Sequence, residues 1–170
     1  MADTSRIDDL RRRVRNDPAS IAFAQLAEEY RRAGQWADAV DTCRAGLAVH
    51  PTYVSARVTL GRALLALERL DEAEAELQTV LSAAPENLAA TRALADVCRK
   101  QGRPADAVAH YTAALRLAPN DPDLERAVAD LGGKASATRL SRPDAELARA
   151  TSTIAALEAW LEAIHAARAH

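Results

Sequence analysis

The chain has 170 residues, of which 49% are hydrophobic, 27% are charged and only 4% are aromatic. This size fits one globular domain with an appended segment, and the many alanines and leucines favour helix over strand. A net charge of −2 gives no overall attraction to nucleic acid or to an anionic membrane, and every apolar run is too short for a membrane span or a signal peptide. We therefore expect an all-α, cytoplasmic protein.

The first predicted element is a cap helix within residues 1–19. Ile7, Leu10 and Val14 form an apolar stripe at helical spacing. A stripe of this kind covers the open end of a neighbouring helical unit.

An arginine-rich stretch, RRRVR at 11–15, lies on this helix and is a candidate for binding nucleic acid or membranes. Asp8 and Asp9 lie within three or four residues of these arginines, and no aromatic side chain is interleaved for base stacking. We therefore expect ion pairs on a solvated helix or a protein contact, without nucleic-acid binding.

The next predicted region, 20–131, repeats with a period of 34 residues. Apolar residues follow helical spacing in two blocks per period, so each unit is predicted to be a helical hairpin. The positions that share the period are Pro51, Pro85 and Pro119; Ala39, Ala73 and Ala107; Leu26, Leu60 and Leu94; and Leu47, Leu81 and Leu115.

This pattern resembles the tetratricopeptide-repeat (TPR) family. The first unit matches it through Phe23, Leu26, Ala27, Tyr30, Gly34, Trp36, Ala39, Cys43, Gly46 and Pro51. The resemblance implies a right-handed superhelical solenoid of stacked helix-turn-helix hairpins, with three units and a half-unit in 20–131. It also implies that Trp36 is a packing residue.

The same resemblance implies a concave groove, lined by the first helix of each hairpin, that holds a peptide or helix. The implied groove residues are Ile21, Glu28, Arg31, Val58, Arg62, Leu65, Arg92, Asp96 and Arg99. Arginines with apolar residues between them suit an amphipathic ligand with acidic side chains, although a merely solvated surface is the alternative. The carboxylate clamp of chaperone-tail receptors is not expected, because its positions hold Ala24, Glu28, Thr59, Ala89 and Ala93.

The last two predicted regions are a flexible linker at 132–142 and an amphipathic helix at 143–170. The apolar face of this helix consists of Ile154, Leu157, Trp160, Leu161 and Ile164. This apolar face requires a partner. The alternatives are the groove of the same molecule, the same surface of another copy, a different protein, and the end of the third hairpin, which the helix would cap permanently.

Catalytic and metal-binding patterns are not found in the sequence. No two of the four histidines stand at i, i+4, and Cys43 and Cys98 are too far apart for a metal knuckle and are predicted to be buried. We therefore expect no cofactor, no metal and no enzyme activity. The sequence favours a noncatalytic adaptor or scaffold that binds a protein or peptide, without membrane insertion. The alternative is a self-assembly module whose C-terminal helix docks on another copy.

Overall fold

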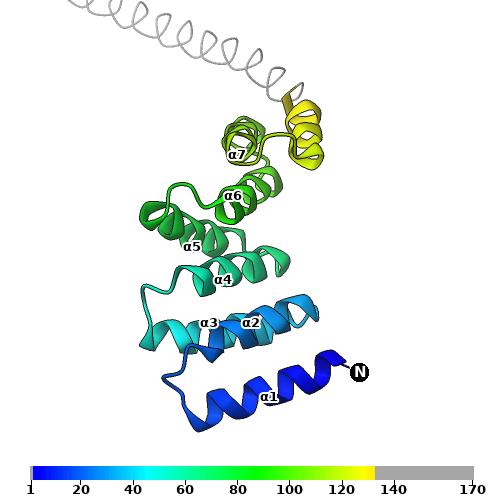
Figure 1. The fold of residues 1–170 in the computed structure, drawn as a ribbon. Helices are drawn as coiled ribbons and strands as arrows, with labels where there is room; N and C mark the ends of the chain where they lie inside the picture. Colours follow the sequence, from blue (N-terminus) through cyan, green and yellow to red (C-terminus); the bar gives the residue numbers. More distant parts are fainter. Residues whose placement is uncertain (1, 133–170) are drawn as a thin grey trace, which may run out of the picture.

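The computed structural model describes residues 2–132, with side chains from residue 5 onward, and within this range the chain forms a stack of α-helices without strands (Figure 1). The helices are α1 (Ala2–Asn16), α2 (Ala22–Arg32), α3 (Trp36–Val49), α4 (Val54–Ala66), α5 (Leu70–Ala83), α6 (Leu88–Lys100) and α7 (Pro104–Leu117), followed by a further helix at 122–132. The all-α prediction is confirmed, with eight stacked helices packed as adjacent pairs.

The predicted C-terminal helix at 143–170 lies outside the described residues. The predicted linker does too, except for Gly132, and so do the five apolar positions Ile154, Leu157, Trp160, Leu161 and Ile164. Between residues 2 and 132, no helix combines the length and the apolar character that crossing a membrane requires.

Each hairpin turns through one residue in the left-handed backbone conformation. These residues are Gly34, Glu68 and Gly102, with φ of 74°, 60° and 73°. The following residue then donates its N–H back into the first helix, as Gln35 does to the Tyr30 carbonyl at 2.9 Å. Glu68 adopts the conformation despite its β-carbon, which costs about 1 kcal/mol relative to right-handed backbone.

Small residues allow the two helices of a hairpin to pack closely. Ala39 and its equivalents in the next two units are fully buried. A β-carbon at Gly46 would lie 2.0 Å from Cδ2 of Phe23, and one at Gly61 would lie 2.7 Å from Cγ of Leu77. These contacts explain why a side chain larger than hydrogen does not fit at either glycine.

Helix α1 covers the open face of the first hairpin. Ile7 and Leu10 are buried against it, and the Arg11 Nε donates a hydrogen bond of 2.5 Å to the Tyr30 hydroxyl. The expected ion pairs are confirmed: Arg11 lies 3.5 Å from Asp8, and Arg12 lies 2.5 Å from Asp9. The arginine-rich stretch is thus partly neutralised by its own helix.

Helix 122–132 lies beside α7 at the other end of the stack (Figure 1). Leu124 is 1% exposed and Leu131 is 8% exposed, and both pack in a core cluster with Cys98 and Tyr111. This helix occupies the place of the first helix of a fourth unit.

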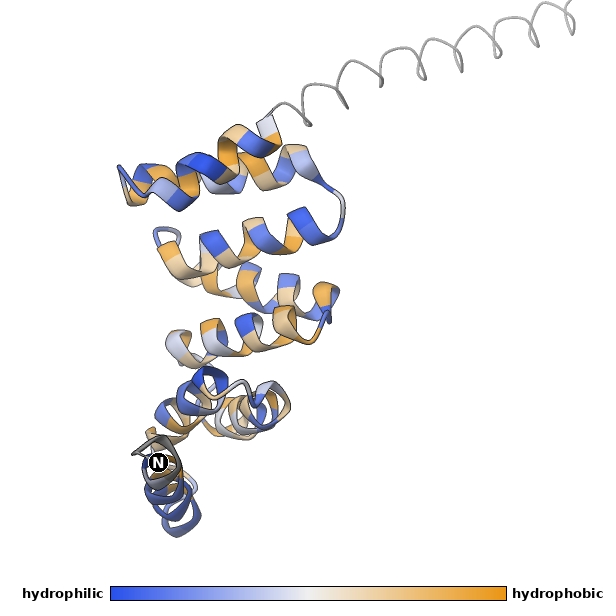
Figure 2. Ribbon diagram, turned by 90° about the vertical axis from the view of Figure 1, so that its right-hand side faces the viewer, coloured by the Kyte–Doolittle hydropathy of each residue, from blue (hydrophilic) through white to orange (hydrophobic). Residues whose placement is uncertain are grey.

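The stack curves because the two kinds of helix are spaced differently. The first helices contact one another, α2 with α4 and α4 with α6, whereas the second helices α3, α5 and α7 do not. The closely spaced first helices therefore form the inner, concave surface. Figure 2 shows hydrophilic and hydrophobic residues alternating along the helices, as expected when one face packs on neighbours and the other meets solvent.

Candidate functional site: the concave surface of the first helices

The concave surface contains a cavity of about 670 Å³ between α2, α4 and α6, which we call the central cavity. Trp36, Leu65 and Leu88 form its apolar wall together with three alanines. Its charged lining consists of the cationic residues Arg31, Arg62, Arg92, Arg99 and Lys100 and the single carboxylate Asp96. A cavity with this lining favours a ligand that is both apolar and acidic.

Two cavities that flank the central cavity do not share its excess of cationic lining residues. A cavity of about 340 Å³ nearer the N-terminus has two arginines and two glutamates in its lining, and one of about 720 Å³ nearer the C-terminus has three arginines and three aspartates. The charges in these two flanking cavities are therefore balanced. A ligand that is attracted by charge will prefer the centre of the groove.

Most of the groove residues expected from the sequence meet in this cavity. Those that line it are Arg31, Arg62, Leu65, Arg92, Asp96 and Arg99. Glu28 lines the flanking cavity on the N-terminal side instead. Val58 is buried in the core at 8% exposure, and Ile21 is 57% exposed just before α2, so neither lines the central cavity.

Glu28 holds Arg31 in place at one edge of the central cavity. The Nε and Nη2 atoms of Arg31 donate hydrogen bonds of 2.8 and 2.7 Å to the two carboxylate oxygens. Thr59 donates a further hydrogen bond of 3.3 Å to Glu28 from the next hairpin. The bonds from Arg31 lower the pKa of Glu28, so this carboxylate stays ionised and neutralises its neighbour.

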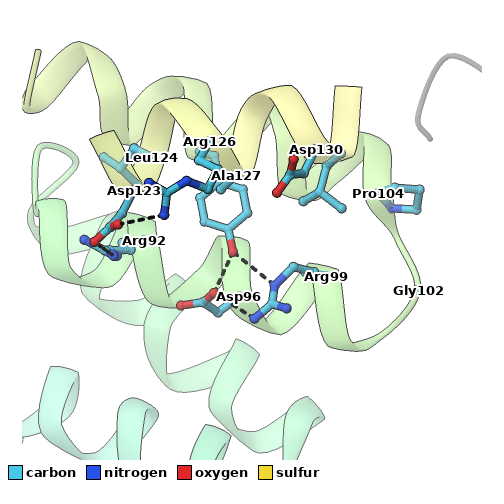
Figure 3. A pocket seen from close by; sticks show the side chains of 12 residues that line it. Arg92, Asp96, Arg99, Gly102, Pro104, Asp123, Leu124, Arg126, Ala127 and Asp130 are labelled. Atoms are coloured by element: carbon cyan, nitrogen blue, oxygen red, sulfur yellow. Dashed lines mark hydrogen bonds and ion pairs between the residues drawn. The ribbon is translucent and has the colours of Figure 1, made fainter. Parts of the chain in front are cut away.

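Asp96 and Arg99 form a similar pair on the third hairpin (Figure 3). Arg99 lies 3.3 Å from Asp96, and the Tyr111 hydroxyl donates a hydrogen bond of 2.5 Å to the same carboxylate. Burial raises the pKa of Tyr111 to about 12, so its hydroxyl remains a donor at neutral pH. Asp96 and Arg99 line both the central cavity and the C-terminal one, whereas Tyr111 lines the C-terminal one.

Arg92 connects the same wall to the end of the solenoid. It lies 3.4 Å from Asp121, which directly precedes helix 122–132. It also lies 3.6 Å from Asp123 at the start of that helix (Figure 3). These ion pairs are partly exposed and therefore contribute little to stability. They do, however, give Arg92 carboxylate partners within the chain.

Trp36 was expected to be a packing residue, but it also lines the central cavity. Its side chain is half-buried at the start of α3. The sequence signal for this second role is the position of Trp36, which follows the first hairpin turn at Gly34 and so stands beside the end of a first helix. Leu88, at the start of α6, was likewise missed.

The described residues contain little that suggests chemistry beyond binding. Both cysteines are buried and unpaired, as expected, and burial raises the pKa of Cys43 to about 12, which makes it a poor nucleophile. Within residues 5–132, no group of three His, Cys, Asp or Glu side chains is placed to hold a metal ion.

Comparisons with known proteins identify the repeat. A family model described as tetratricopeptide repeat matches residues 24–81 and 58–122. Among curated protein sequences, none matches this chain significantly. Similar solved structures include MamA 41-end from Desulfovibrio magneticus RS-1, with a TM-score of 0.73 and 16% identity over 83% of this chain and 80% of that one.

Two further structures are similar to this fold. The first TPR of Spaghetti (RPAP3), bound to the HSP90 peptide SRMEEVD, has a TM-score of 0.66 and 14% identity over 70% of this chain and 94% of that one. TTC0263, a thermophilic TPR protein in Thermus thermophilus, has a TM-score of 0.63 and 26% identity over 74% of this chain and 70% of that one. The family model and the stacked hairpins together show that this chain belongs to the tetratricopeptide-repeat family, whose domains are generally noncatalytic protein-interaction modules.

Proposed function

We propose that this protein is an adaptor or scaffold that binds an amphipathic peptide or helix with acidic side chains in its central cavity. The observation that carries this proposal is the lining of that cavity, where five cationic side chains and one carboxylate surround an apolar wall. Four of these cations have carboxylate partners within residues 5–132, so the fifth, Arg62, is the one left to attract an acidic ligand. The flanking cavities share the groove but have balanced charges. A charge excess at one place in the groove gives a ligand both a preferred position and a preferred composition.

We further propose that the C-terminal segment 143–170 regulates this site by occupying it. In sequence, the segment combines the apolar residues Leu157, Trp160 and Leu161 with neighbouring glutamates, Glu158 and Glu162. This composition complements the cationic and apolar lining of the cavity. The alternative is that the segment docks in the cavity of a second copy, which relies on the same complementarity. Measurement of the oligomeric state distinguishes docking within one molecule from docking between copies.

A peptide-binding assay tests the proposal. A fluorescently labelled peptide of residues 143–170 is added to the full-length chain and to a full-length variant with Trp160→Ala and Leu161→Ala, which we call the tail variant. We expect tighter binding to the tail variant, because its own segment competes less well for the cavity. A peptide that binds neither protein overturns the proposal that this segment is a ligand.

Two matched substitutions test the place of binding. Ala89 is exposed and lines the central cavity, whereas Ala45 is exposed on α3, a second helix. Ala89→Glu in the tail variant should abolish peptide binding through added bulk and negative charge, and Ala45→Glu should leave it unchanged. If the Ala89→Glu and Ala45→Glu proteins bound the peptide equally well, the assignment to the central cavity would be overturned.

Sedimentation of the full-length chain over a range of concentrations separates the two modes of docking. A monomer at all concentrations supports occupancy within one molecule. An oligomer that dissociates on dilution and is lost in the tail variant would favour self-assembly instead.

A further inference from the structure

The three hairpins place different charges at one equivalent position of their first helices. Glu28, Arg62 and Asp96 are separated by 34 residues each, and the residues three positions later are Arg31, Leu65 and Arg99. In the outer hairpins the acid and the arginine form an ion pair within the helix, at 2.7 Å for Glu28 and Arg31 and at 3.3 Å for Asp96 and Arg99. The middle hairpin departs from this arrangement, because it has arginine at the first position and leucine at the second.

Arg62 therefore differs from every other cationic residue of the central cavity. Arg31, Arg92 and Arg99 have the carboxylate partners described above, and Lys100 pairs with Glu68. Among residues 5–132, no carboxylate lies within ion-pair distance of Arg62. Partial desolvation and the positive charges of Arg31 and Arg92 lower the pKa of Arg62, whereas the carboxylates of Glu28 and Asp96 raise it from beyond ion-pair distance.

The surroundings of Arg62 combine this guanidinium with an apolar wall. Leu65 lies one helical turn further along α4, on the same face as Arg62, and Trp36 lines the same cavity from the first hairpin. A guanidinium offers paired N–H groups whose geometry matches a carboxylate. The cavity thus places a receptor for a carboxylate next to a surface for a large apolar side chain.

We propose that Arg62 is the specificity-determining residue of the groove, which binds a side-chain carboxylate of a helical ligand while Leu65 and Trp36 contact an apolar side chain one turn away. This inference rests on the proposed function, and it defines the ligand class. The ligand is a helix in which Glu or Asp stands three or four residues from a large apolar residue. The sequence of the C-terminal segment has this spacing, with Glu158 four residues after Ile154 and three before Leu161.

The test measures the affinity of the labelled peptide of residues 143–170 for the tail variant, with and without Arg62→Gln. Loss of a charge-assisted hydrogen bond should weaken binding about tenfold or more. Arg62→Lys, which keeps the charge without the paired donors, should give an intermediate affinity. The matched control is Arg116→Gln, which removes the same charge from an exposed position on α7, a second helix.

A double-mutant cycle identifies the carboxylate. The peptide has four side-chain carboxylates, and each is replaced in turn through Asp144→Asn, Glu146→Gln, Glu158→Gln or Glu162→Gln. Each altered peptide is titrated against the tail variant with and without the additional substitution Arg62→Gln. The peptide that lacks the Arg62-bound carboxylate should bind both proteins with the same affinity. If all four altered peptides still lose affinity on Arg62→Gln as the original peptide does, no side-chain carboxylate of this ligand binds Arg62 and the inference is overturned.

The outcomes separate this inference from the proposed function. If Arg62→Gln changes affinity no more than Arg116→Gln, while Ala89→Glu still abolishes binding, the groove binds the peptide and the role of Arg62 is wrong. If the peptide does not bind the tail variant at all, the proposed function and this inference fail together. Thermal unfolding controls for folding, because removal of an unpaired charge near Arg31 should not lower the Tm.

Discussion

Replacing Gly46 with alanine tests the close packing of the first hairpin. Gly46 lies inside α3, where alanine is preferred over glycine by about 1 kcal/mol. The added β-carbon would lie 2.0 Å from Cδ2 and 2.2 Å from Cγ of Phe23. Carbon atoms in contact are normally separated by about 3.5 Å or more. Helix propensity and packing therefore predict changes of opposite sign.

The structure indicates that packing dominates. The ring of Phe23 is 1% exposed and is held between His50 and Tyr53, at centroid distances of 5.9 and 5.7 Å. Overpacking at such a site costs about 3 kcal/mol. After the gain in propensity, Gly46→Ala should lower the free energy of unfolding by about 2 kcal/mol, which corresponds to a decrease in Tm of about 2–4 °C for each kcal/mol.

Urea unfolding followed by circular dichroism measures this change. The control is Phe23→Leu, which leaves room beside Gly46, so the alanine substitution should cost much less in that background than in the original chain. An increase in the free energy of unfolding of Gly46→Ala, as propensity alone predicts, would refute the close approach of α2 and α3.

Three further predictions concern the turns and the buried titratable groups. Glu68→Gly should raise the free energy of unfolding by about 0.5 kcal/mol, because glycine adopts the positive φ of this turn without steric strain. Gly34→Ala should lower it by about 1 kcal/mol through backbone strain alone, because an added β-carbon there meets no atom within 4 Å. Urea titrations compare both variants with the original chain. Burial raises the pKa of Cys43 to about 12, so its thiol should react with Ellman's reagent at pH 8 only after unfolding, and rapid reaction of the native protein would contradict its burial. Burial lowers the pKa of His110, so the unfolded chain binds the proton more readily; the stability linked to His110 should be complete above the unfolded pKa of about 6.5 and decrease as the pH falls through it. The Tm between pH 7.5 and 5 should therefore depend less on pH in His110→Gln than in the original chain.

The limits of prediction from sequence are clearest in the groove. The positions of Arg31, Arg62 and Leu65 on the first helices followed from the repeat, and the structure places all three in one cavity. Val58, which shares their helical face in the pattern, is instead buried, because the neighbouring first helices pack closely enough to cover it. Periodicity specifies the face of a helix, but it does not specify how far a neighbouring hairpin extends over that face.

The sequence by itself determined the features of this protein that depend on local structure. The 34-residue period, the glycines at Gly34 and Gly102 and the small residue at Ala39 predict the hairpins, their turns and their buried contacts, because helix periodicity and turn geometry involve residues close in the chain. Only the tertiary structure decided which charges meet across hairpins. Arg92 finds its partners 29 and 31 residues away, whereas Arg62 finds none among the described residues. Such pairings depend on the spacing and rotation of stacked hairpins, which packing of the whole solenoid sets.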